Sequence, residues 1–168
     1  MNPTATLYMT NGAKITIELL PEYAPNTVNS FIYAASHKVF DQHPIERIVP
    51  GNWIDMSYTG FRKAEGQYLI PYESNLHPEI SPLDSDVGCV CMGGYGELGQ
   101  AGYEFFFPLR ACPEHKGLYP VFGKVISGLD EILRLEHIPT RPVEDFPIPG
   151  IEVNTPVTPE IIDHVELN

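Results

Sequence analysis

Residues 5–20 read ATLYMT-NG-AKITIELL, and this stretch decides the fold class. Asn11-Gly12 is the strongest two-residue signal for a β-hairpin turn, because both residues tolerate a positive φ. In the second half, every other residue from Ile15 to Leu19 is apolar and the residues between are polar, which is typical of a strand with one buried face. The chain is therefore expected to begin with an antiparallel hairpin, Ala5–Thr10 paired with Ala13–Leu20.

The apolar period changes after this hairpin. Pro25 suits the first position of a helix, and the apolar residues that follow it recur at helical spacing as far as Ala35. Gly128–Leu135 has the same spacing and predicts a second short helix. The remaining apolar segments are strand candidates between turns. They are Pro44–Val49, Asn52–Tyr58, Gly66–Ile70, Val87–Met92, Tyr103–Leu109, Val121–Ile126 and Ile161–Leu167.

Seventeen prolines and fourteen glycines divide the 168 residues into short segments, which favours many strands over long helices. Strands joined by turns, without a βαβ pattern, predict a closed antiparallel barrel, since closure removes unpaired strand edges. We therefore expect a mainly β fold in a single domain, residues 1–168. The acidic, proline-rich segment Pro139–Pro159 is expected to be a long loop, and the sequence leaves open whether it lies across a neighbouring surface.

The net charge of −12 comes from 22 acidic and 10 basic residues. Such a surface repels phosphate backbones and anionic lipids, so we expect neither nucleic acid nor membrane among the partners. No apolar run reaches 18 residues, and the start, Met1-Asn2-Pro3-Thr4, lacks the pattern of a signal peptide. Three cysteines are too few for a disulfide scaffold. Together these features favour a cytoplasmic location.

Cys89 and Cys91 share one face of a predicted strand, but no further cysteine or histidine pair has the spacing of metal ligands. Core packing is the interpretation that we favour for both. The six histidines show no His-Glu-x-x-His pattern either. We expect no metal site.

Three segments, taken in order, resemble the cyclophilins. The first is Phe40-Asp41 with Ile45–Gly51 (IERIVPG), which is similar to the stretch around the catalytic arginine of that family. The second is Gly88–Gly94 followed by Tyr103–Phe107 (YEFFF), and the third is Tyr119–Val125 (YPVFGKV). The resemblance extends over nearly the whole chain, which is identified as a divergent, bacterial-like member of the family.

The resemblance implies a closed eight-stranded antiparallel β-barrel capped by two short α-helices, with a packed centre and a peptide groove on the outer wall. The implied activity is peptidyl-prolyl cis/trans isomerisation of X–Pro bonds in peptides and unfolded proteins, in support of protein folding. It requires no metal and no cofactor. We expect the protein to act as a monomer.

Site residues follow from the resemblance, position by position. Arg47 is the implied catalytic arginine, and Phe106 the floor of the proline pocket. The other implied substrate-binding residues are Asn52, Trp53, Asp55, Gly93, Gly94, Tyr95, Glu104, His115 and Tyr119.

Several of these positions depart from the family. Asn52 replaces a large aromatic residue, Tyr119 a histidine and Glu114 a tryptophan, and Asp55 and Glu104 stand where the family has glutamines. If both carboxylates reach the arginine, each ion pair is worth roughly 4 kcal/mol before desolvation, against about 1.5–3 kcal/mol for a charged hydrogen bond to substrate. We therefore expect a slower isomerase that prefers Lys or Arg near the proline. The alternative is a proline-peptide-binding module with weak or no isomerase activity.

Overall fold

The main sheet of this computed structural model, which describes residues 1–57 and 64–168, has nine antiparallel strands and confirms the mainly β prediction. In spatial order they are β3 (His43–Pro44), β13 (Ile161–Leu167), β1 (Thr4–Met9), β2 (Lys14–Leu19), β10 (Val121–Ser127), β7 (Cys89–Met92), β9 (Phe105–Pro108), β5 (Trp53–Asp55) and β4 (Arg47–Val49). The predicted hairpin is β1–β2, with Leu7 opposite Ile15.

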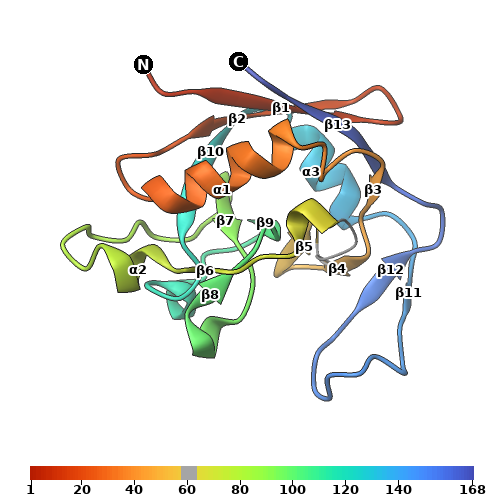
Figure 1. Ribbon diagram of the computed structural model, residues 1–168. Coiled ribbons are helices and arrows are strands. Elements are labelled where there is room, and N and C mark those ends of the chain that lie inside the picture. The colour runs from red at the N-terminus through yellow and green to blue at the C-terminus, as the bar shows by residue number, and fades with distance from the viewer. Residues whose placement is uncertain (58–63) are drawn as a thin grey trace.

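The sheet curls until its two edge strands come close together (Figure 1). β3 ends at Pro44 and β4 begins at Arg47, so their ends lie no more than about 11 Å apart along the chain. The expectation of a closed eight-stranded barrel was nevertheless wrong in detail, because the described strand order has nine members and ends at β3 and β4. The outer edge of β4 is engaged elsewhere, since the Asn154 side chain donates a hydrogen bond to the Ile48 carbonyl at 3.0 Å.

Both predicted helices are present as α1 (Pro25–Ser36) and α3 (Leu129–Glu136). Helix α1 buries its apolar stripe in the curled sheet, where the Phe31 ring meets Phe105 edge-on at 5.5 Å between centroids. A one-turn helix, α2 (Glu73–Leu76), was not predicted, because four residues carry no helical period. The short 3-10 segments are η1 (Ala64–Gly66), η2 (Gly96–Leu98) and η3 (Pro113–His115).

Three strand predictions need correction. Gly66–Ile70 is not a strand: Gly66 closes η1 against the Tyr103 ring, and only β6 (Ile70–Pro71) pairs, with β8 (Gln100–Ala101). Pro44–Val49 is broken into β3 and β4. Asn52–Tyr58 shortens to β5, and Tyr58 lies outside the described residues.

The predicted long loop at Pro139–Pro159 is instead a two-stranded arm. β11 (Thr140–Pro142) pairs antiparallel with β12 (Asn154–Pro156), and the arm, residues 140–156, projects from the barrel at the lower right of Figure 1. In the sequence, the prolines of this segment favour a loop. Two prolines of the arm sit at the ends of its short ladder, where the lost N–H does little harm.

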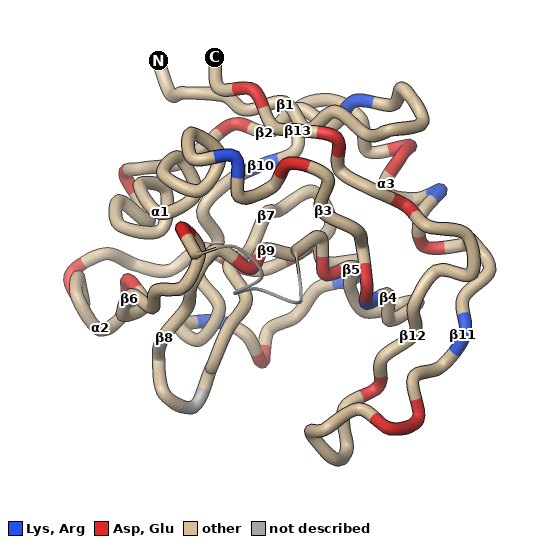
Figure 2. The backbone as a smooth tube through the Cα atoms, turned by 45° about the vertical axis from the view of Figure 1, so that its right-hand side comes forward, with Lys and Arg blue, Asp and Glu red and all other residues tan. Residues whose placement is uncertain are grey.

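The core fills the inside of the curled sheet, and Phe105 and Phe107 belong to it. Phe106 lies between them in sequence but belongs to a separate small cluster with Cys91 and Val121. This is the alternation expected of a strand, and it brings one phenylalanine of the three to the outer wall. Acidic positions are scattered over the whole backbone, with few basic ones between them (Figure 2). Among the described residues, every helix is too short or too polar to span a bilayer.

Candidate functional site

A cavity of about 600 Å³ opens on the outer wall of the barrel, between the strands β4, β5 and β9 and the arm. All the predicted site residues except Asn52 line it. They are Arg47, Trp53, Asp55, Gly93, Gly94, Tyr95, Glu104, Phe106, His115 and Tyr119. Their sequence separation is large, so this convergence is a property of the fold.

Strand register explains why three of these residues meet. Arg47 on β4 pairs with Asp55 on β5, and Asp55 pairs in turn with Phe106 on β9. Directly paired residues of neighbouring strands point to the same face of a sheet. Their neighbours Ile48, Ile54 and Phe107 point into the core and are fully or almost fully buried, so the row from Arg47 to Phe106 must face the outer wall.

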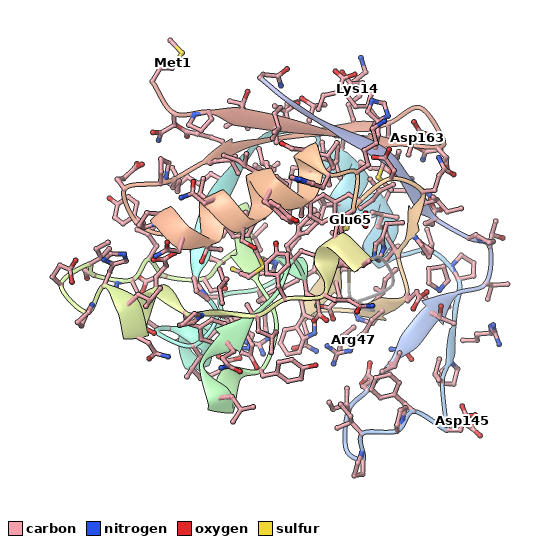
Figure 3. The ribbon with its side chains drawn as sticks, in the orientation of Figure 1. Met1, Lys14, Arg47, Glu65, Asp145 and Asp163 are labelled. Carbon is pink, nitrogen blue, oxygen red and sulfur yellow. The ribbon has the colours of Figure 1, made fainter. Side chains whose placement is uncertain are left out.

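The Arg47 guanidinium is fixed from two sides. Its Nη1 donates a hydrogen bond to Asp55 Oδ2 at 2.8 Å, and its Nε donates to the carbonyl of Glu152 in the arm, also at 2.8 Å. The side chain is only 13% exposed, and its guanidinium carbon lies 5.8 Å from the Trp53 ring centroid. Figure 3 places Arg47 between the barrel and the arm. The guanidinium thus meets the cavity in one defined orientation.

Asp55 is a buried carboxylate beside this arginine. Burial raises its pKa from 3.8 to about 6, and the attraction of Arg47 offsets only part of that rise. The ion pair therefore strengthens as the pH rises through about 6, where Asp55 loses its proton.

We predict a pH-dependent stability difference between the wild type and Asp55→Asn. Between about pH 4 and 6 Asp55 keeps in the native state a proton that it has lost in the unfolded state, so the contribution of this group to the wild-type free energy of unfolding falls as the pH rises. The pKa shift of about two units corresponds to a loss of about 3 kcal/mol in the free energy of unfolding across this pH range. Asp55→Asn has no such carboxyl and is expected not to show this loss. Urea unfolding at pH 4, 5, 6 and 7.5 checks this, with exposed Asp145→Asn as control. A wild-type-to-variant difference that stays constant with pH would contradict it.

Four rings form the apolar end of the cavity. Phe106 is only 4% exposed and meets Trp53, His115 and Tyr119 edge-on, with ring centroids 6.4, 5.8 and 6.0 Å away. Burial lowers the pKa of His115, which favours the neutral form of its ring. A neutral, ring-lined floor of this kind accepts an apolar group of a ligand.

The opposite rim of the cavity is the segment 93–95. Gly94 has φ of +134°, and a Cβ atom there would lie 2.6 Å from the carbonyl oxygen of Gln100, so only glycine fits. The amide of Gly93 donates to the carbonyl of Glu104 at 2.7 Å, and that of Tyr95 to Gln100 at 2.8 Å. Because these two amides already donate within the protein, we expect neither of them to bind a ligand, and the half-exposed Tyr95 ring is the apolar part of this rim.

Asn52 stands apart from the other predicted residues. Its Oδ1 accepts a hydrogen bond from Nε of Arg110 at 2.8 Å, and Arg110 forms an ion pair with Glu114 at 2.7 Å. The guanidinium carbon of Arg110 lies 5.7 Å from the Trp53 ring centroid. Asn52 thus contributes to a polar support beside Trp53.

Three residues that line the cavity were missed from the sequence. Phe146, Ile148 and Ile151 all come from the arm. Large apolar residues in an otherwise acidic, proline-rich segment are the one sequence feature that points to these three residues. Without predicted strands, however, a loop cannot be placed against the barrel from the sequence. Across residues 1–57 and 64–168, no three His, Cys, Asp or Glu side chains are grouped as metal ligands.

Residues 5–155 match the family model described as cyclophilin type peptidyl-prolyl cis-trans isomerase/CLD. Peptidyl-prolyl cis-trans isomerase B of Bacillus subtilis is 32% identical over 127 residues, covering 76% of this chain and 86% of that protein. A peptidyl-prolyl cis-trans isomerase-like 2 of Cryptococcus neoformans is 30% identical over 148 residues, covering 86% of this chain. The chain spans only 25% of the length of that Cryptococcus protein.

The fold is also that of solved structures. A cyclophilin type peptidyl-prolyl cis-trans isomerase of Cryptosporidium parvum superposes with a TM-score of 0.78 at 19% identity, covering 100% of this chain and 98% of the other. A second crystal structure of that protein, obtained in the presence of the dipeptide Ala-Pro, gives a TM-score of 0.77 at 19% identity, with 98% of each chain covered. At this identity the likeness shows the fold alone.

Proposed function

This chain belongs to the cyclophilin type peptidyl-prolyl cis-trans isomerase family, and from that premise we propose that it catalyses cis/trans isomerisation of X–Pro bonds in peptides and unfolded proteins. One observation carries the proposal: the Arg47 guanidinium is fixed beside a ring-lined pocket on the outer wall, in one row with Asp55 and Phe106. The arginine supplies charge and the rings supply an anchor for a pyrrolidine.

The chemistry needs only those two parts. Rotation about a peptide bond meets a barrier of about 18–20 kcal/mol, because the C–N bond has partial double-bond character. During rotation the prolyl nitrogen loses conjugation, becomes pyramidal and gains a lone pair. Arg47 donates a hydrogen bond toward that nitrogen, which stabilises the twisted state more than the planar one. Phe106 holds the proline ring while the residue before it turns.

The wider setting is part of the same proposal. We propose that residues 1–168 work as one monomeric domain in the cytoplasm, where the protein assists the folding of proline-containing chains. The acidic surface supports partners other than nucleic acids and anionic membranes, since it repels both.

The test is a protease-coupled assay with Ala-Pro and Lys-Pro peptides, in which the protease cleaves only the trans form. The proposal requires the slow phase, which takes tens of seconds or longer when uncatalysed, to shorten in proportion to protein concentration. An unchanged slow phase at every concentration would rule out isomerase activity on these peptides.

A second candidate is a proline-peptide-binding module without turnover. The observation in its favour is that Nε and Nη1 of Arg47 already donate hydrogen bonds within the protein, to Glu152 and Asp55. Binding of the same peptides in an NMR titration, with no shortening of the slow phase, would decide for the module.

We predict that Asp55→Asn/Glu104→Gln is a faster isomerase than the wild type. Asp55 binds the guanidinium directly and Glu104 lines the same cavity, so loss of both charges weakens the pull on Arg47 away from the substrate. We expect kcat/KM on Ala-Pro peptides to rise about tenfold, equivalent to about 1.4 kcal/mol of transition-state free energy. We also expect any preference for Lys-Pro over Ala-Pro to vanish. The hypothesis fails if the variant is no faster and the wild type gains nothing from basic residues.

A further inference from the structure

The arm contributes the side chains that complete the cavity, although it lies far along the chain from the strands of the site. Phe146, Ile148 and Ile151 form one apolar edge of the cavity, here called the arm wall, and Tyr95 lines the same cavity from the rim 93–95. The arm wall shares the cavity with the ring-lined pocket, and the cavity volume of about 600 Å³ exceeds the needs of one pyrrolidine. Space remains for a neighbouring side chain of the same ligand.

We propose that the arm wall is a specificity site, which binds a large apolar side chain within two residues of the proline of a bound peptide. This proposal rests on the proposed function, since it extends the same groove. Ile148 is 49% exposed and Tyr95 is 44% exposed, so apolar surface on both sides of the cavity is open to a ligand. Burial of such surface is the main source of affinity in apolar pockets.

The arm is anchored firmly enough to act as a wall. The Asn154 side chain donates a hydrogen bond to the Ile48 carbonyl at 3.0 Å and another to Oε2 of Glu152, two residues earlier, at 2.7 Å. The Glu152 carbonyl accepts from Arg47 Nε at 2.8 Å, and the Val143 amide donates to the Val153 carbonyl at 2.8 Å. The base of the arm, next to Ile151 of the arm wall, is therefore held in fixed relation to the guanidinium.

The charged side chains of the arm do not compete for this space. The four charged residues of the arm are all exposed, and none lines the cavity: Arg141, Glu144, Asp145 and Glu152. Asp145 points away from the barrel in Figure 3. The surface that the arm turns toward the groove is apolar, which favours Leu, Ile or Phe over a charged residue at the matching position of a ligand.

Beyond its two strands, the tip of the arm carries two X–Pro bonds of its own, Phe146-Pro147 and Ile148-Pro149. If the arm bound in the pocket as a self-ligand, that is, in place of a substrate peptide, it would fill the pocket. Instead, the arm residues line a cavity that stays open at about 600 Å³. The geometry thus favours a wall over a self-ligand.

The test uses five-residue peptides built around Ala-Ala-Pro-Ala-Ala, with leucine placed in turn at each of the four alanines. NMR titration gives Kd for each peptide, and a coupled assay gives kcat/KM. We expect at least one leucine position to improve wild-type binding about tenfold over the all-alanine peptide. In Ile148→Ser that ratio should fall to threefold or less. Ile126→Ser is the matched control, because Ile126 is 55% exposed and lies outside the cavity.

Each outcome bears on the proposal. No gain from leucine at any position, or a gain that is equal in Ile148→Ser, would overturn it. Tighter binding of every peptide by Ile148→Ser would also overturn it, because it would identify the arm as a competing self-ligand. Leucine-dependent binding without turnover supports the arm wall and contradicts the isomerase, whereas turnover without leucine preference does the reverse.

Discussion

Arg47→Ala is expected to lower kcat/KM for X–Pro peptides by roughly 10²–10³-fold, the range seen when one preorganised donor to a developing charge is removed. The Arg47 guanidinium is held in place by Asp55. It lines the same cavity as Phe106 and the other rings. Since the donor acts on the twisted state, the loss should appear mainly in kcat, with little change in peptide Kd. The coupled assay measures kcat/KM, and an NMR titration measures Kd.

Two controls separate this effect from damage to the fold. Arg110→Ala removes an arginine at nearly the same distance from Trp53, 5.7 against 5.8 Å, but one that does not line the cavity. Arg47→Ala leaves the buried Asp55 carboxylate without this ion pair, so Arg47→Ala/Asp55→Asn is compared with Asp55→Asn alone. A double variant as active as Asp55→Asn would remove Arg47 from the mechanism.

Phe106→Ala is expected to weaken peptide binding about 100-fold. The side chain forms the floor on which Trp53, His115 and Tyr119 converge, and it is almost fully buried. Its loss also leaves a cavity that lowers the free energy of unfolding by about 3–5 kcal/mol. Kd is measured by titration and unfolding by urea, both below the temperature at which the variant melts.

Phe106→Leu serves as the matched variant, because it retains most of the buried volume while removing the ring. We expect its stability to lie within about 1.5 kcal/mol of the wild type and its Kd to rise several-fold. A Phe106→Ala variant that binds peptides as tightly as the wild type would place the proline elsewhere.

Local patterns were enough to predict most of the barrel. The hairpin from Ala5 to Leu20, both longer helices and the strand Ile161–Leu167 follow from period and turn residues alone. The placement of Phe106 on the outer wall follows from alternation along β9. These features depend on neighbours in sequence, and for that reason they are readable without a structure.

The convergence of the site residues was carried by the family resemblance, because strand register across β4, β5 and β9 is set by long-range pairing. The arm was missed for a related reason. Its strands are three residues each and contain prolines, and its place is fixed by Asn154 and Glu152 contacting β4 about a hundred residues earlier in the chain. Asn52 was assigned to the groove by position, whereas its side chain bonds to Arg110.

The direct test of catalysis at this groove is NMR exchange spectroscopy on a single Ala-Pro peptide whose cis and trans signals are resolved. With substoichiometric wild-type protein, exchange cross-peaks between the two forms should appear on a subsecond timescale, and they should be absent with Arg47→Ala. Peptide signals that shift on titration while the cis and trans forms do not exchange would contradict isomerase activity. The protein would then bind proline-containing peptides without isomerising them.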